Sequence, residues 1–356
     1  MQVERVESTG NKVVLHAIAT GEEFREATRQ GVRAFLMSAD APIPEDSQLD
    51  TILGQLLGEA GDLNTAKADF AANYLLPRAI RQQDIIPVCS PSVESRKVPG
   101  DDGNFELRIT VFPKPHIELS SYEPVDITVQ APQVTEDEVD AHMLSLMQKY
   151  GEHQVGLDGQ GKVAEPQAVS LDDLDDAWVA KHIPDPEVNT VERMRETVRK
   201  TGEQYKSAEF EQYKLSVAAH ELSKRLVDSV PTDIIVAMAE SMINELRAQA
   251  SAQGSSLAEV CQQRGMDEDA MMQEARDEAQ AMLMQGLTLD AIYRHEGLSI
   301  DDADRAAALH SIAPGSEDAA EAQLRASGYA FTIEETAQRL RAGRYILEHA
   351  HVTVQV

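Results

Sequence analysis

VERMRETVRKTGEQYKSAEFEQYKLSVAAHELSKRLVDSVPTDIIVAMAESMINELRAQASA, residues 191–252, is the stretch that organises this chain. Small or apolar residues recur there every three or four positions, which predicts one stripe along a helix. The stripe comprises Val191, Met194, Val198, Thr201, Tyr205, Ala208, Leu215, Ala218, Leu222 and Leu226. Asn189 is the expected N-cap, and Glu192 completes a capping box. Pro231 is expected to end this helix and to occupy the first turn of a second one.

The first helix is therefore expected to run from Val191 to Val230, about 60 Å at the usual rise per residue. Gly202 weakens the helix there, and a bend or frayed turn is expected at this position. A helix of this length is not needed to close a compact core. Its length favours a helix that protrudes as an arm or runs through the molecule as a spine.

The composition limits the classes of function. A chain of 356 residues suits two or three domains, and only 4% of its residues are aromatic, so the cores should be aliphatic and rich in methionine. The net charge is −29, of which residues 1–117 carry −5 and the remainder −24. Such a field disfavours direct binding to nucleic acid or to anionic membranes.

Two observations favour the cytoplasm. Cys89 and Cys261 lie far apart without the spacing of a metal site, so two reduced thiols are expected. The sequence begins without a basic region or an apolar core, and no run approaches the ~18 apolar residues of a membrane helix. We therefore expect a cytoplasmic protein that does not enter a membrane.

The periodicities predict an α+β fold, with a small N-terminal β-α-β domain followed by a large, elongated all-helical C-terminal domain with protruding arms. The predicted parts are 1–117, the α+β domain; 118–150, a linker and first helix; 151–169, a short glycine-rich loop; and 170–356, the helical domain. Strands are expected at 3–9, 11–19, 105–112 and 352–354, with an extended segment at 117–129. Helices are expected at 20–38, 49–57, 64–80, from 135, and at 171–180, 257–263, 267–295, 300–312, 317–327 and 333–349.

No motif for enzyme chemistry was found. The chain lacks a P-loop, a dinucleotide fingerprint and a nucleophile elbow. His349 and His351 are spaced like metal ligands, but two histidines alone favour a structural or solvated role. The acidic run from Asp172 to Asp176 lacks the glycine and the terminal glutamate of a calcium loop. We predict no metal, no cofactor and no enzymatic activity.

Methionine is concentrated in one region, with seven of the 12 between Met238 and Met284. Two interpretations are open: these side chains fill the core between helices, or they form an adaptable surface for varied partners. On the second interpretation the client-binding residues are Met238, Met242, Met271, Met272, Met282, Leu283, Met284 and Leu287. The segment 281–287 is apolar nearly all round, so it must be buried or form part of a sticky surface.

Several segments, in order along the chain, resemble the bacterial trigger factor family. They include Ile86-Pro87, Phe112-Pro113-Lys114-Pro115, Val134 to Val139, Leu174 to Trp178, Val191 to Arg195, and Val230-Pro231 with the region 281–302. The resemblance implies a helical peptide-binding domain, clients that are unfolded or nascent polypeptides, and self-association as a homodimer.

The chain departs from the family pattern twice. Only residues 151–166 stand where the family carries a prolyl isomerase domain, which is too short for a domain, so isomerase activity is not expected. The family docks on the ribosome through a basic loop after its first helix. The corresponding residues here carry no lysine or arginine, which argues against docking in that way. They are Ser38, Ala39, Asp40, Ala41, Pro42, Ile43 and Pro44.

Two functions follow as hypotheses. The first is an ATP-independent chaperone in protein folding and transport, which holds unfolded polypeptides in a helical cradle while its charge keeps the complex soluble. The alternative is a dedicated binding or assembly factor for one or a few protein partners, without ribosome docking. An enzyme is the least favoured class, because no convergent catalytic set is visible.

Overall fold

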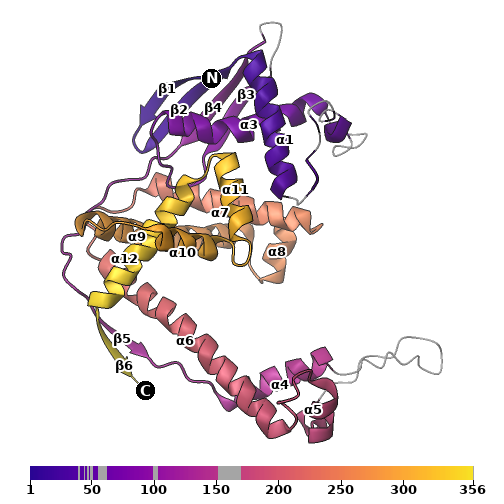
Figure 1. Cartoon of the computed structure of the whole chain (residues 1–356). Helices are drawn as coiled ribbons and strands as arrows, with labels where there is room; N and C mark the ends of the chain where they lie inside the picture. The colour runs from indigo at the N-terminus through magenta and orange to yellow at the C-terminus, as the bar shows by residue number, and fades with distance from the viewer. Residues whose placement is uncertain are drawn as a thin grey trace. The chain divides into compact units, whose positions relative to one another are not determined.

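The computed structural model describes residues 1–38, 41–43, 45, 48, 51–54, 62–98, 103–150 and 170–355. The chain forms two compact units, each built from separate stretches of sequence. Unit 1 comprises Met1–Glu123 and Ala219–His349, and unit 2 comprises Pro124–Ala218 and Ala350–Val356. Figure 1 shows the order of the elements along the chain.

The N-terminal part of unit 1 is a four-stranded antiparallel sheet in the order β1-β2-β4-β3. Its strands are β1 (Gln2–Thr9), β2 (Lys12–Ala19), β3 (Ser92–Lys97) and β4 (Phe105–Val111). Its helices are α1 (Gly21–Ser38) and α3 (Leu63–Gln82). The expected strands at 3–9, 11–19 and 105–112 are confirmed within two residues.

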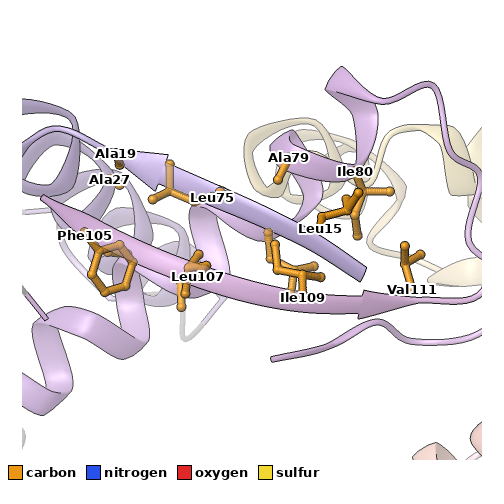
Figure 2. Packing of buried hydrophobic residues seen from close by; sticks show 14 of the residues in the cluster. Leu15, Ala19, Ala27, Leu75, Ala79, Ile80, Phe105, Leu107, Ile109 and Val111 are labelled. Carbon is orange, nitrogen blue, oxygen red and sulfur yellow. The ribbon is translucent and has the colours of Figure 1, made fainter. Parts of the chain in front are cut away.

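Alternation along β2 and β4 builds the core of this part. Every second residue of each strand is apolar, and the register pairs Leu15 with Ile109 and Ala19 with Phe105. Together with Ala and Leu side chains of α3 these residues form one cluster on a single face of the sheet (Figure 2). The opposite face carries ion pairs, among them Lys97 with Glu106 at 2.9 Å.

Helix α1 begins where the sequence predicts. The backbone N–H of Thr20 donates to the Glu23 carboxylate at 2.8 Å, and the Glu23 N–H donates to Thr20 Oγ1 at 3.3 Å. Helix α3 begins one residue earlier than expected, because the Asp62 carboxylate accepts from the backbone of Asn64 and Thr65. The expected helix at 49–57 lies partly outside the described residues, and its described part, 51–54, is helical.

The second part of unit 1 is helical. Its helices are α7 (Thr232–Ala252), α8 (Leu257–Gln263), α9 (Glu268–His295), α10 (Asp302–Ile312), α11 (Glu317–Ser327) and α12 (Phe331–His349). These helices confirm the expected series after Pro231. Pro231 itself is the N-cap of α7 rather than a residue of its first turn. No helix of the described chain is both long and apolar enough to cross a membrane.

Unit 2 contains α4 (Glu136–Tyr150), a 3₁₀ turn η2 (Leu171–Asp173), α5 (Asp176–His182) and most of α6 (Val191–Ser223). Val139 and Met143 of α4 pack with Val179 of α5 and Met194 of α6. Lys206 of α6 reaches Glu138 of α4 at 2.7 Å. The unit also holds a two-stranded parallel sheet of β5 (Asp126–Gln130) and β6 (His351–Gln355).

Helix α6 differs from the expectation at both ends. Thr190, not Asn189, caps it, since Thr190 Oγ1 accepts the N–H of Arg193 at 3.2 Å. The helix ends at Ser223 instead of Val230, because the following residues pair with the linker. Val227 donates its N–H to the Glu118 carbonyl at 2.9 Å. The helix is continuous through Gly202, so no frayed turn occurs there.

The segment 171–180, expected as one helix, is divided into η2 and α5. Asp175 lies between them in an extended conformation and caps α5 through its carboxylate, which accepts the Trp178 N–H at 2.7 Å. Asp175 of this run therefore serves as a helix cap. Asp176 accepts the N–H of Val191, the first residue of α6, at 2.8 Å. The described residues contain no group of acids, histidines and cysteines that could hold a metal.

Candidate functional site

Helices α7, α8 and α9 share an aliphatic core within unit 1. Ala239 and Ile243 of α7, Leu257 of α8, and Ala275 and Ala279 of α9 are buried in it. The small alanine side chains let α7 and α9 approach closely, and the flexible methionines fill the irregular space around them. Cys261 is buried in the same cluster and is not in a disulfide.

The eight residues predicted to bind clients are divided between core and surface. Met271, Leu283 and Leu287 are buried, with 3%, 4% and 2% exposure, so they stabilise the fold as core residues. Met238, Met242, Met272 and Met284 are half-buried at the edges of these cores. Met282 is exposed, at 49%.

The segment 281–287 is therefore neither fully buried nor one continuous surface. Ala281 and Met282 face outward, whereas Leu283, Gly286 and Leu287 face inward. Half-buried thioether groups on the surface of α7 and α9 are apolar and adaptable, which suits contact with varied partners. Whether clients bind them stays a prediction.

Leu283 and Leu287 belong to a second cluster, which joins α7 and α9 to the end of the N-terminal part. Ile117 is buried against Val230 and Ile234 in this cluster, and Phe112 packs at its edge. The residues that follow β4 thus lie against α7 and α9 within unit 1.

A group of charged side chains around the buried Asp290 fixes the same connection. Arg339 of α12 donates from Nε and Nη2 to the two carboxylate oxygens of Asp290 on α9, at 3.0 Å each. Lys114 Nζ lies 3.1 Å from Asp290 Oδ2 and also pairs with Glu335. The two positive charges of Lys114 and Arg339 thus balance the two negative charges of Asp290 and Glu335. Gly286 makes room for the pair, because a Cβ there would lie 3.1 Å from the Arg339 guanidinium.

For both Asp290 and Lys114, burial and the neighbouring opposite charges shift the pKa in opposite directions. Burial acts to raise the pKa of Asp290, but the hydrogen bonds and charges of Arg339 and Lys114 outweigh it, and the pKa is lowered. Burial lowers the pKa of Lys114, and the Asp290 carboxylate offsets this only in part. A group of this kind positions the linker, because each of its charges lies beside an opposite charge and Asp290 at its centre is buried.

Unit 1 also contains a cavity of about 510 Å³ with both apolar and charged lining, which the sequence does not predict. It lies between the end of α3 and the start of α12, and Ile85, Ile86, Phe331 and Ile333 contribute apolar lining. Ile86 is 48% exposed. In the sequence, Ile86-Pro87 stands out only through the family resemblance, and the exposure of Ile86 depends on contacts that no local pattern reveals.

Unit 2 has a groove of about 410 Å³ between α4 and α6. Val134, Val139 and Val198 give it an apolar lining, and the Tyr205 side chain beside it is 65% exposed. Gly202, expected to bend α6, instead lies in this groove, and a Cβ there would come within 3.3 Å of Val134.

The loop predicted to correspond to a docking loop is only partly described. Ser38 ends α1, while Ala39, Asp40 and Pro44 lie outside the described residues. Ala41 packs against the small cluster of Val32 and Leu36. Pro42 and Ile43 are exposed, Ile43 at 52%.

Comparison with known proteins identifies the class. The model of the bacterial trigger factor C-terminus matches residues 190–348, and a second model of bacterial trigger factor matches residues 51–146. Trigger factor of Bacillus subtilis (strain 168) is 21% identical over 427 aligned residues, covering 98% of this chain and all of that protein. Trigger factor of Clavibacter michiganensis subsp. michiganensis is 31% identical over 102 residues, 28% of this chain and 21% of that protein.

A solved structure is also similar, from work on promiscuous substrate recognition in the folding and assembly activities of the trigger factor chaperone. Its TM-score is 0.39 at 16% identity, over 98% of this chain and all of that chain. The two family models together match most of the chain, and the similarity to the Bacillus subtilis protein runs through nearly all of it. The chain belongs to the trigger factor family, and it has a chaperone role in protein folding.

Proposed function

We propose that this protein is an ATP-independent chaperone of the cytoplasm that holds unfolded or nascent polypeptides on apolar surfaces of its helices. The main support for the proposal is that two sequence models of the trigger factor family match this chain, one before and one after residues 147–189. The half-buried and exposed methionines of α7 and α9 support it, since they offer apolar contact without a fixed shape. The net charge of −29 would keep a complex with an unfolded client in solution.

The proposed activity is holding, without prolyl isomerisation. Residues 151–169 are too few for a catalytic domain of the kind that the family carries at this place. Docking on the ribosome through residues 38–44 is not part of the proposal, because these residues carry no lysine or arginine to meet ribosomal RNA.

The test is aggregation of a chemically unfolded, unrelated protein after dilution, without ATP and with increasing amounts of this protein. We expect suppression near stoichiometric ratios. The double variant Met272→Gln, Met282→Gln should suppress aggregation several-fold less well, because two apolar contacts become polar. The matched control, Met272→Leu with Met282→Leu, keeps the apolar surface and should behave as the wild type.

The dedicated assembly factor is the second candidate, favoured by the lack of basic residues at 38–44. Affinity purification from the native host distinguishes the two. Many substoichiometric partners would support the general chaperone, whereas one stoichiometric partner, together with no suppression of aggregation, would overturn it in favour of the dedicated factor.

A further inference from the structure

The sheet of β5 and β6 in unit 2 has an outer edge on β6. The His351 N–H donates to the Val125 carbonyl at 2.9 Å, and the Ala131 N–H donates to the Gln355 carbonyl at 2.7 Å. These two bonds close a parallel ladder with continuous register. Figure 1 shows the two strands side by side. Within the described chain, β5 is the one strand that pairs with β6.

The pairing with β5 determines which backbone N–H and C=O groups of β6 form hydrogen bonds within the sheet. In a parallel pair, alternate residues direct both their N–H and their C=O to the neighbouring strand. On β6 these residues are His351, Thr353 and Gln355. The N–H and C=O groups of Val352 and Val354 consequently point away from β5, toward the outer edge.

The side chains of β6 have a matching pattern. Val352 and Val354 lie beside Ile127 and Val129 of β5, so the sheet has one apolar face. Ile127 and Val129 are only 3% and 2% exposed, but Val354 is 46% exposed. The apolar face therefore continues to the outer edge, where a further strand with alternating apolar residues would extend it.

Both edges of the four-stranded sheet are protected, and the outer edge of β6 is not. Charged residues and breaks in register are devices that prevent pairing with another strand. Both edges of the four-stranded sheet have them, with register shifts between Arg5 and Glu7 and between Val93 and Ser95. The charged residues there are Glu4, Arg5 and Glu7 on β1, and Glu94, Arg96 and Lys97 on β3.

Strand β6 carries no Lys, Arg, Asp, Glu or Pro in its five residues, and its register with β5 is unbroken. Val352, Thr353 and Val354 are β-branched, the type that favours strands. The free edge of β5 is less suitable, because Asp126 lies on the strand and Pro124 and Pro132 flank it.

We infer that the outer edge of β6 binds an extended, uncharged segment of an unfolded polypeptide as a third strand. The inference rests on the proposed function and adds a second way of holding a client, through its main chain. An unfolded chain has unpaired N–H and C=O groups, so bonds to Val352 and Val354 require no particular sequence. A two-stranded sheet is marginal alone, and a third strand would stabilise it.

The test uses the full-length protein and a fluorescent peptide of alternating valine and threonine. Val354→Pro removes the outward N–H and leaves the bonds to β5 intact. It should weaken peptide binding about tenfold, since one hydrogen bond is lost and the proline ring blocks pairing of a third strand. Val354→Thr keeps the N–H and the shape of the side chain, and it should bind within about twofold of the wild type.

A second probe is the same peptide with every second amide N-methylated, which should bind about tenfold more weakly to the wild type. Equal binding by wild type and Val354→Pro, or an equal loss in both variants, would overturn the inference. A homodimer that Val354→Pro dissociates in sedimentation would overturn it too, assigning the edge to a second copy. Failure of the wild type to suppress aggregation would instead overturn the proposed function.

Discussion

Glu94 on the outer strand β3 is held by three side chains. Its carboxylate accepts from Lys12 at 2.9 Å and from Arg108 at 2.8 Å, and it also accepts the Thr110 hydroxyl hydrogen bond. The Thr110 hydrogen bond, followed by that of Lys12, lowers the pKa of Glu94 from 4.5 to about 2. The charged form of Glu94 therefore ties β3 to β2 and β4.

A group with a lowered pKa stabilises the fold above its unfolded pKa and loses that effect as the pH falls through its folded pKa. Glu94→Gln should therefore lower the free energy of unfolding by about 1 kcal/mol at pH 7. The difference from the wild type should shrink between pH 4.5 and about 2. Urea unfolding followed by circular dichroism at pH 7, 4 and 2.5 measures it.

The control is Glu203→Gln, at an exposed position of α6. Its difference from the wild type should be small at every pH. A Glu94→Gln effect that is constant from pH 7 to pH 2.5 would show that Glu94 stabilises the sheet through its shape and not through its charge.

Single residues also show where the sequence is insufficient. The composition predicts that methionines fill imperfect cores, and Met271 confirms it, yet Met282, with the same side chain, is exposed. Periodicity places both on α9 but does not say which side of the helix another helix covers. The sorting of core from surface depends on the contact with α7, which is tertiary.

Helices α1 and α3 approach each other closely at Gly31. A Cβ at this position would lie 2.2 Å from the carbonyl oxygen of Phe70 and 3.1 Å from its Cβ. The contact is with backbone, so no side-chain rotation can relieve it. The two helices could accept a larger residue only by moving apart, which would disturb the cluster of Val32 and Leu36.

Gly31→Ala should therefore lower the free energy of unfolding by about 2 kcal/mol, in spite of alanine's better helix propensity. Gly54→Ala is the matched control, because this residue is also helical and a Cβ there meets nothing within 4 Å. The control should be neutral or more stable. If both variants lose equal stability in thermal unfolding, the α1–α3 contact is not the cause.

The sequence predicts most of the helices and strands, because the capping residues and periodicities that define them lie within each segment. The capping boxes of Thr20 with Glu23 and of Thr135 with Glu138 are observed as hydrogen bonds. The end of α6 was wrong by seven residues, because Leu226 leaves the helical pattern to pair with Leu119 in the linker. The sequence pattern of residues 191–230 cannot predict this pairing, because Leu119 lies outside that range.

The whole molecule carries a large excess of negative charge. Acidic residues number 61 against 32 lysines and arginines, and the sequence pI is about 4.6. Repulsion between like-charged complexes opposes their association, and it vanishes as the net charge approaches zero.

Complexes with an unfolded client should accordingly stay in solution at pH 7.5 and precipitate as the pH approaches 4.6. Centrifugation and light scattering across this range measure the effect, with the protein alone at each pH as the control. Complexes that are equally soluble at both ends of the range would show that the net charge does not keep them in solution.

The pairing of β5 with β6 joins residues 225 positions apart in the chain, as for Asp126 and His351. At 5–20 residues per second, translation needs roughly 10 to 45 s to deliver the second strand after the first. The four-stranded sheet, by contrast, is complete once residue 111 has been made. The sheet of β5 and β6 is therefore among the last parts of the protein to acquire its native pairing, and until then β5 depends on Asp126 and its two flanking prolines to resist pairing with a wrong strand.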